Sequence, residues 1–151
     1  DTSPGSPPYI EMIGGQFQWH GAQVSVAAIN QAPECSACRH LPGEWTVFDE
    51  IYLFKNFDRA KVRGLLSLDK HPNNKTPGDY PIAWVRDYGQ GRVFYTSLGH
   101  REDVWEPHSP AQRGGFKNSP EVAEAFQQHL LGGIKWALGL DNCDPTTTPI
   151  K

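Results

Sequence analysis

Long apolar runs, an excess of charge and a cysteine-rich framework are all missing from this chain of 151 residues. No stretch approaches the roughly 20 apolar residues that a membrane span needs, so we expect no membrane span. The formal net charge is only −3 at pH 7, which argues against nucleic acid or a membrane surface as a partner. The length fits one domain with a core of its own, and 13 prolines with 15 glycines predict that it is rich in loops.

Cysteine is scarce, with Cys35, Cys38 and Cys143 as the complete set. Covalent haem attachment needs a histidine directly after the second cysteine, but His40 comes one residue later, so we predict no haem. A local Cys35–Cys38 disulfide and two free thiols both remain open, and Cys143 is expected to pair with neither because it lies in a polar tail. A zinc site at this pair would lack ligands beyond His40. An oxidising compartment would favour the disulfide, and we favour a periplasmic or secreted protein over a cytoplasmic one.

Composition divides the chain into an extended arm at residues 1–8, a domain at residues 9–140 and a polar tail at residues 141–151. The arm is rich in proline, serine and glycine, and the tail in proline and threonine. The domain starts with a short helical turn at residues 9–13, which two glycines end. Apolar alternation predicts a strand at residues 23–29, aromatic and β-branched residues predict one at 46–54, and residues 62–68 are predicted as a short buried strand. Loops are predicted at residues 30–43 and 69–79.

The most informative segment covers residues 80–100, where two β-rich runs flank Gly89-Gln90-Gly91. This glycine-containing connection predicts a β-hairpin. The second run ends on Gly99-His100, and an imidazole directly after a strand lies where open α/β sheets place their ligands. From this segment alone, an ordinary surface histidine after a turn glycine is an equally good interpretation. The irregular segment that follows, residues 101–118, is long enough to indicate a functional loop.

The clearest helix signal begins at Ser119, which can cap a helix with Pro120 in its first position and Glu121 in its first turn. Gly139 ends this helix. Apolar residues at helical spacing predict its buried face: Val122, Phe126, Leu130, Ile134 and Leu138, with Ala125 and Ala137.

Several other positions of these elements predict packing rather than chemistry. Gly132 and Gly133 lie in the middle of the helix and fit a backbone that packs directly on the sheet. His129 beside the apolar stripe predicts a core histidine that the sheet satisfies. Trp84, flanked by apolar residues inside a strand, predicts core packing as well.

Six short motifs occur in a fixed order along the chain. They are F-x-x-H at residues 17–20, D-E-x-Y at 49–52, P-I-A-W at 81–84, G-x-G-R-x-F-Y at 89–95, G-H at 99–100 and H-L-L-G-G-I-x-W-A at 129–137. Together they resemble the ThuA-like (trehalose-utilisation) family over residues 9–139. The resemblance implies an α/β, flavodoxin-like three-layer sandwich that is related to the class I glutamine amidotransferases.

One large departure accompanies this resemblance. Members of the family carry a further N-terminal half, so this chain would supply the C-terminal portion, with the later strands and the last helix. Either the chain is a fragment, or the rest is another polypeptide, or the module is degenerate. We expect the missing half or another chain to complete the sheet, with Val24, Val26 or the strand at residues 62–68 near the contact.

The resemblance selects His20, Glu50 and His100 as the catalytic residues. Two histidines with a carboxylate can hold a divalent metal such as zinc or act as general acid and base without one. The plainer interpretation is that Asp49 and Glu50 are loop charges and that His20 bonds the backbone. Four further residues are candidates for substrate binding: Asp49, Tyr52, Trp105 and Glu102.

His100-Arg101-Glu102 also resembles the His-x-Glu pair of the glutamine amidotransferases. There the glutamate orients the histidine toward a cysteine nucleophile, and no cysteine of this chain lies in a strand-to-helix turn. We therefore expect no amide hydrolysis by this chain alone.

The function that the resemblance implies is carbohydrate metabolism, with chemistry on a keto-sugar or a related glycoside by an isomerase, lyase or hydrolase. A small-molecule carbohydrate would be the partner of the site. The alternative is a non-catalytic accessory or structural subunit of a larger assembly that retains the fold.

Overall fold

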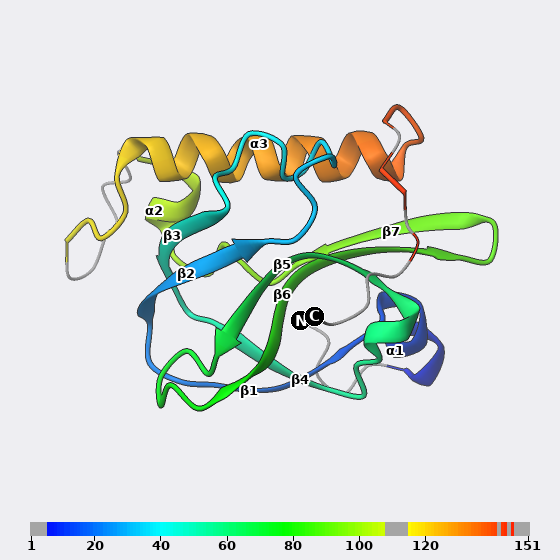
Figure 1. The fold of residues 1–151 in the computed structure, drawn as a ribbon, viewed down its shortest axis with the longest axis horizontal. Coiled ribbons are helices and arrows are strands. Elements are labelled where there is room, and N and C mark those ends of the chain that lie inside the picture. Colours follow the sequence, from blue (N-terminus) through cyan, green and yellow to red (C-terminus); the bar gives the residue numbers. More distant parts are fainter. Residues whose placement is uncertain (1–5, 108–114, 142, 145, 147–151) are drawn as a thin grey trace.

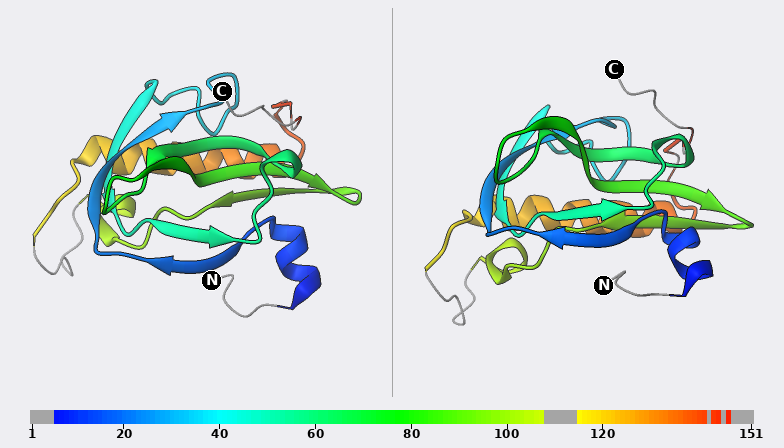
Figure 2. Two further views of the ribbon diagram at one scale, coloured as in Figure 1. Left: turned by 60° about the horizontal axis from the view of Figure 1, so that its bottom comes forward. Right: turned by 90° about the horizontal axis from the view of Figure 1, so that it is seen from below.

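The computed structural model describes residues 6–107, 115–141, 143, 144 and 146, and shows one long helix packed on a sheet (Figure 1). Helix α3 (Pro120–Ala137) lies on one face of a five-stranded sheet, and a two-stranded ribbon of β1 (Gln16–His20) and β4 (Tyr52–Lys55) lies on the other (Figure 2). The remaining elements are β2 (Val24–Asn30), β3 (Glu44–Asp49), β5 (Arg63–Lys70), β6 (Pro77–Tyr88), β7 (Gly91–Thr96), the helices α1 (Pro7–Ile13) and α2 (Glu102–Trp105), and the 3₁₀ turn η1 (Arg59–Lys61).

The sheet order is β3-β2-β5-β6-β7, and every pairing between the described strands is antiparallel. The mixed α/β class is therefore confirmed, while the flavodoxin-like three-layer sandwich, which has a parallel sheet, is not confirmed. Strands β2 and β5 lie inside the sheet, each with a neighbour on both sides. The prediction that Val24, Val26 or residues 62–68 lie near a contact with another chain or the missing half stays a prediction. β2 pairs with β5 only at Ile29 and Asn30, so Val24 and Val26 have a strand partner among the described residues only in β3.

The predicted hairpin is confirmed in β6 and β7. Their ladder closes on Tyr88 and Gly91, so the connection is Gly89-Gln90, one residue shorter than the sequence indicated. Gly89 has a φ of 58°, in the left-handed region that such tight hairpin turns require. Trp84 of this hairpin is fully buried, as expected, and donates its indole N–H to the carbonyl oxygen of Ile13 (2.9 Å).

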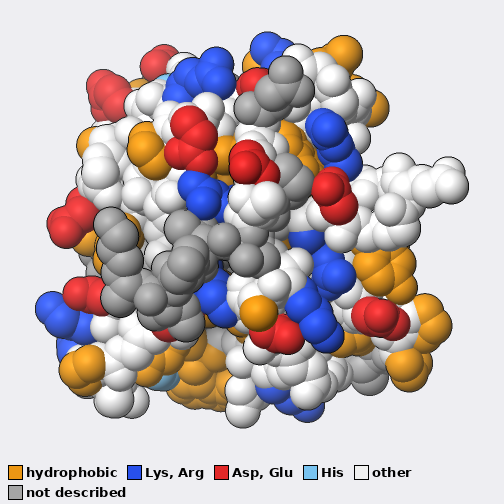
Figure 3. Space-filling view, turned by 45° about the vertical axis from the view of Figure 1, so that its right-hand side comes forward, with side chains coloured by type: hydrophobic (Ala, Val, Ile, Leu, Met, Phe, Trp, Pro, Cys, Tyr) orange, Lys and Arg blue, Asp and Glu red, His pale blue; other side chains and the backbone are white. Residues whose placement is uncertain are grey.

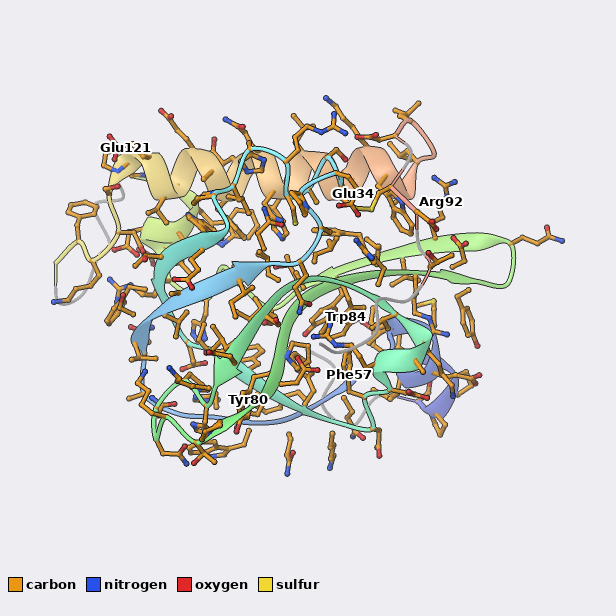
Figure 4. The ribbon with its side chains drawn as sticks, in the orientation of Figure 1. Glu34, Phe57, Tyr80, Trp84, Arg92 and Glu121 are labelled. Carbon is orange, nitrogen blue, oxygen red and sulfur yellow. A yellow bond between two sulfur atoms is a disulfide. The ribbon has the colours of Figure 1, made fainter. Side chains whose placement is uncertain are left out.

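Aromatic side chains join the ribbon to the sheet. The ring of Trp84 stacks on Tyr95 with 4.2 Å between centroids, and Phe54 of β4 and Phe57 each meet Trp84 edge-on. In Figure 4 the labelled side chains of Trp84 and Phe57 lie together on the side of the sheet away from α3. Because aromatic pairs of this kind stabilise beyond their buried area, they fix the ribbon against the sheet.

The single strand predicted for residues 46–54 is two strands in different sheets. β3 pairs with β2, β4 pairs with β1, and the chain turns between them at Glu50 and Ile51. Ile51 is buried, and the Asp49 carboxylate accepts a hydrogen bond from the Glu50 N–H (2.8 Å). Residue composition alone predicts one strand here, because no turn residue separates the two strands. The turn is held in part by hydrogen bonds to Asp49 from the backbone of Gly99 and Arg101, about 50 residues away in sequence.

Helix α3 begins after Ser119 with Pro120, as predicted, but its buried face differs from the predicted stripe. The face against the protein consists of Ala123, Phe126, His129, Gly132, Gly133 and Trp136, whereas Ile134 and Leu138 are exposed. The two glycines cause the difference. A Cβ on Gly132 would overlap the backbone of Ser36, and one on Gly133 would overlap the Phe94 ring, so the helix approaches its neighbours along the glycines and not along the leucines.

A disulfide joins Cys35 to Cys143, 108 residues apart, and Cys38 is the free, buried cysteine. The prediction that Cys143 pairs with neither cysteine is therefore wrong. Helix α3 packs against the loop that contains Cys35, with Gly132 against Ser36, so the chain after the helix ends near Cys35. Trp136 fixes Cys143 there by donating its indole N–H to the Cys143 carbonyl (2.9 Å). Burial, with a smaller effect of the Glu34 carboxylate, raises the pKa of the Cys38 thiol to about 12.

The other predicted elements fit in outline. The helical turn at residues 9–13 belongs to α1, which begins at Pro7, while residues 1–5 of the predicted arm and most of the tail lie outside the described residues. The segment at residues 101–118 contains α2, and residues 108–114 are outside the description. No described helix has the length and apolarity to cross a membrane. Figure 3 shows acidic and basic side chains interspersed on the face that it presents.

Candidate functional site

The carboxylate of Glu50 lies between two imidazoles. Its Oε1 is 2.6 Å from Nδ1 of His100 and its Oε2 is 3.1 Å from Nδ1 of His20. The three residues come from the end of β1, the turn between β3 and β4, and the segment after β7. The structure thus brings together the three residues that the sequence selected.

The ring nitrogens of the two histidines have different surroundings. Nδ1 of His20 lies 3.0 Å from the carbonyl oxygen of Gly21 as well as near Glu50, so it faces two acceptors and must carry the proton. Nδ1 of His100 likewise faces Glu50 and the hydroxyl of Tyr52. No hydrogen bond from either Nε2 to a described residue is found, and both side chains are close to half exposed (44% and 49%). Both Nε2 atoms are therefore left for a ligand or a proton.

Tyr52 completes this group from β4. It is the register partner of His20 in the ribbon, and its hydroxyl is 3.3 Å from Nδ1 of His100. Burial, with the nearby Glu50 and Asp49 carboxylates, raises the pKa of Tyr52, which keeps the hydroxyl protonated and able to donate.

Asp49 lies beneath the site and not on its surface. Its side chain is buried, and its two oxygens accept hydrogen bonds from the backbone N–H groups of Gly99 (2.6 Å), Arg101 (3.0 Å) and Glu50 (2.8 Å). Burial raises the pKa of Asp49, and the backbone donors oppose that rise. These contacts on both sides of His100 and on Glu50 give Asp49 a positioning role, whereas the sequence indicated contact with substrate.

A second polar network supports the segment after His100, and sequence analysis did not find it. The guanidinium of Arg101 bonds both carboxylate oxygens of Asp103 (2.9 and 3.1 Å) and the side chain of Gln23 (2.7 Å). Burial alone would raise the pKa of Asp103, but hydrogen bonds from Arg101, Lys117 and Asn118 hold it well below its usual range. No local motif marks this network, because its members are joined only when the segment folds back.

Asn118 extends the same network to strand β3. Its amide accepts from the Phe48 N–H (2.8 Å) and donates to the Phe48 carbonyl (2.9 Å), as a neighbouring strand would. This contact fixes the end of β3 directly before Asp49. The position of Glu50 therefore depends on a buried asparagine that is 68 residues away in sequence.

A cavity of about 230 Å³ opens beside His100. Phe17 and Tyr52 from the ribbon and Tyr95 from β7 give it aromatic walls, and residues 96–100 complete its lining. The hydroxyl of Thr96 is buried and has no hydrogen-bond partner among the described residues. The cavity combines aromatic surface with polar atoms near an imidazole, as small-molecule sites do.

Two further candidates from the sequence lie in helix α2. Trp105 is 46% exposed, donates its indole N–H to the Gly99 carbonyl (2.6 Å) and meets the Phe126 ring edge-on. It therefore flanks the segment that carries His100 without lining the cavity. Glu102 is exposed at the first position of α2. The carboxylate at Nδ1 of His100 is Glu50, so the arrangement differs from the His-x-Glu pair that the sequence suggested.

A metal site needs several ligand atoms close to one another. Among the described residues, one trio of His, Cys or carboxylate groups has ligand atoms all within 4.8 Å of one another, namely Glu34, Cys35 and Cys143, and its two sulfur atoms form the disulfide. His20, Glu50 and His100 are not so close in this arrangement. Their geometry fits a different role for the carboxylate, since metal-binding histidines commonly donate their second N–H to a carboxylate and ligate through the other nitrogen.

Comparison with known proteins gives one family. The model of the ThuA family, described as trehalose utilisation, matches residues 1–137. A search of curated proteins gives no match.

Two solved structures of ThuA-like proteins share the fold. The one from Bacteroides uniformis has a TM-score of 0.63 and 20% identity over 94% of this chain and 55% of its own. The one from Parabacteroides merdae has a TM-score of 0.53 and 22% identity over 91% and 44%. This chain thus spans about half the length of the solved structures that it matches.

Proposed function

Because the chain belongs to the ThuA family, we propose that it forms part of a carbohydrate-active enzyme that works on a keto-sugar or a related glycoside. The observation that carries this proposal is the contact of one carboxylate, Glu50, with Nδ1 of both His100 and His20. A paired carboxylate stabilises an imidazolium, so the histidines can accept and return a proton at Nε2.

His100 is the proposed base, because it lines the cavity and its Nε2 has no partner among the described residues. In a keto-sugar, the carbon next to the carbonyl holds the proton that such a base removes. Glu50 stabilises the imidazolium that forms, and His20 shares the same carboxylate as a second proton carrier. Tyr52, kept protonated, can donate to a substrate oxygen.

The aromatic walls favour a sugar as the ligand, since the C–H-rich face of a sugar ring docks on aromatic surface. Tyr52 is proposed to bind substrate from inside the cavity, and Trp105 and Glu102 are proposed to do so from its outer side. Asp49 acts in this proposal by holding the backbone on both sides of His100.

A divalent metal such as zinc is compatible with the same residues. Nε2 of His20 and of His100 would hold it, with Glu50 orienting both rings through Nδ1. A bound metal of this kind would supply a Lewis acid for the substrate carbonyl.

The wider setting follows from the disulfide and the family. A disulfide between Cys35 and Cys143 favours an oxidising compartment, so a periplasmic or secreted location is proposed. The chain would then be the C-terminal portion of a flavodoxin-like, three-layer sandwich of the glutamine amidotransferase type. The two solved ThuA-like structures are about twice as long as this chain, which covers 55% and 44% of them.

Proton exchange tests the proposal directly. Keto-glucosides and their parent glucosides are incubated with the full natural protein in D₂O, and deuterium next to the carbonyl is measured by NMR. Incorporation is expected only with the keto-sugars, and a His100→Gln variant should lose it while a His71→Gln variant, changed in a distant loop, should keep it. Equal incorporation by wild type and His100→Gln would refute the proposal.

A further inference from the structure

A cavity of about 340 Å³ is lined by α1, the start of β1 and the segment after β4. Its volume exceeds that of the cavity beside His100, about 230 Å³, and no residue lines both. Figure 2 shows α1 beside the start of β1, and His20 ends that strand, about 13 Å further along at the usual rise per residue. The cavity is therefore separate from the candidate site, and the proposed carbohydrate chemistry does not use it.

Arg86 of β6 brings an unbalanced positive charge to this cavity. Its side chain is half-buried, and its Nη1 donates to the Glu11 carbonyl (2.8 Å), a bond that caps the last turn of α1. The carboxylates of Glu11 and Asp58 belong to the same lining, but neither they nor any other described carboxylate forms an ion pair with this guanidinium. A charge that is partly removed from water without a counter-charge is costly, so the cavity favours an anion beside Arg86.

The capping bond explains one donor of Arg86 and leaves the opposite edge of the guanidinium unexplained. Nε is buried and has no hydrogen-bond partner in the described part of the chain, and no bond from Nη2 to a described residue is found. Nε and Nη2 project from the same edge, which matches the two oxygens of a carboxylate. A buried donor without an acceptor costs free energy, so this edge favours an occupant that supplies one.

The other charges of the lining distinguish between anions. Nζ of Lys61 is 3.8 Å from the Asp58 carboxylate, whose other oxygen accepts the Ala60 N–H (3.0 Å), so these two charges balance each other. The exposed carboxylate of Glu11 adds a further negative charge to the lining. Because like charges repel, this environment opposes a phosphate dianion more strongly than a single carboxylate.

Two amides and an apolar wall suit the rest of such a ligand. Nδ2 of Asn56 donates to Oε1 of Gln16 (2.9 Å), which leaves a donor on Gln16 and an acceptor on Asn56 for hydroxyl groups. Pro7 and Ile10 of α1 supply apolar surface to the same lining. Apolar surface with a few convergent polar groups, in a volume of this size, is typical of small-molecule sites.

We propose that this cavity binds a hydroxylated monocarboxylate of monosaccharide size, a sugar acid by its chemistry. Its carboxylate accepts from Nε and Nη2 of Arg86, and its hydroxyl groups bond the amides of Gln16 and Asn56. The ligand thereby supplies the counter-charge and the acceptors that the protein does not provide to Arg86.

Calorimetric titration of the full natural protein with D-glucuronate tests the proposal, with D-glucose and inorganic phosphate as comparison ligands. D-glucuronate should bind at one site per chain, and the other two should bind more weakly by about tenfold or more, because glucose lacks the carboxylate and phosphate meets the acidic lining. Arg86→Gln removes the guanidinium edge. Gln16→Glu keeps the acceptor for Asn56 and adds a like charge beside the ligand, so each variant should weaken D-glucuronate binding by about tenfold or more.

Two variants serve as matched controls and should bind D-glucuronate as the wild type does. Arg92→Gln removes an arginine that likewise donates to a helix carbonyl, that of Trp136 (3.1 Å), but lies outside the cavity. Gln18→Glu adds the same charge at an exposed position of β1 outside the lining.

The candidate site provides the remaining comparison, since His100→Gln should also leave D-glucuronate binding unchanged. Weakened binding in His100→Gln would place the ligand beside His100 and overturn the proposal. Absence of D-glucuronate binding, or equal binding of glucose or phosphate, would overturn it as well. Because none of these readouts involves turnover, the proposal can fail while the proposed carbohydrate chemistry stands, and the reverse.

Discussion

The Glu50 carboxylate lies 2.6 Å from Nδ1 of His100, 50 residues away in sequence, and its second oxygen holds His20 at 3.1 Å. Three separate pieces of chain must be fixed for this contact to form. The ribbon brings His20, the turn after β3 brings Glu50, and the buried Asp49 holds the backbone around His100. The fold therefore shapes the site mainly by fixing the backbone that carries these side chains, and Asp49 fixes the part around His100.

Glu50→Gln should leave the fold intact and reduce kcat/KM for the keto-sugar by about 10- to 100-fold, the usual effect of losing a carboxylate that orients a histidine. The amide keeps the shape but can no longer balance the charge of an imidazolium. Steady-state kinetics measures the effect. Glu44→Gln, at the exposed start of β3, is the control and should be near wild type; equal losses in both variants would contradict the assignment.

Asp49→Asn should destabilise the protein by about 1–3 kcal/mol, because an amide nitrogen would face a backbone N–H where an oxygen now accepts. Either Gly99 on one side or Glu50 and Arg101 on the other would lose its acceptor. Urea unfolding measures the change, with Asp69→Asn on an exposed position as the control. An Asp49→Asn variant with wild-type stability and activity would show that these contacts do not position His100.

Much of this arrangement could be predicted from the sequence, and the parts that could not share one cause. Alternation identified β2, whose side chains alternate between core and more exposed surroundings, and the apolar run at residues 62–68 identified the buried strand β5. The motifs selected His20, Glu50 and His100. The break after Asp49, the buried face of α3 and the pairing of Cys143 all depend on contacts over long sequence separations. Glycine illustrates this best, since Gly132 and Gly133 have no side chain to mark a buried face and nevertheless lie on it.

His129 should make the protein sensitive to mild acid. It is fully buried, its Nδ1 donates to the Ala37 carbonyl (2.7 Å), and its Nε2 has no partner in the part of the chain that the structure describes. Burial lowers its pKa from 6.5 to about 4. Between these values the unfolded chain binds the proton and the folded one does not, so stability falls as pH falls from about 6.5 toward 4.

From pH 7 to pH 5 this single group should cost about 2 kcal/mol of unfolding free energy. His129→Gln removes the titration, so its stability should change less over that range than that of wild type, as urea unfolding at both pH values will show. His71→Gln is the control, because His71 is only half-buried and lies in a loop turn outside the core. An equal loss of stability in wild type and His129→Gln would contradict the assignment.

Cys143→Ser should reduce the unfolding free energy by about 2–4 kcal/mol, because the Cys35–Cys143 bond closes a loop of about 100 residues. Cys38→Ser is the matched control and should keep the bond. Peptide mapping without reduction should recover the Cys35 peptide linked to the Cys143 peptide. A Cys35–Cys38 link in the natural protein would contradict this pairing.

Glu50 holds both imidazoles by Nδ1 and leaves both Nε2 atoms for chemistry. Long-range ¹⁵N–¹H correlation spectra of the histidine rings, recorded near pH 8 on metal-free natural protein, report the tautomer of each ring directly. We expect the Nδ1–H tautomer for His20 and His100, and loss of that preference at His100 in Glu50→Gln. The Nε2–H tautomer at both rings in the wild type would contradict it.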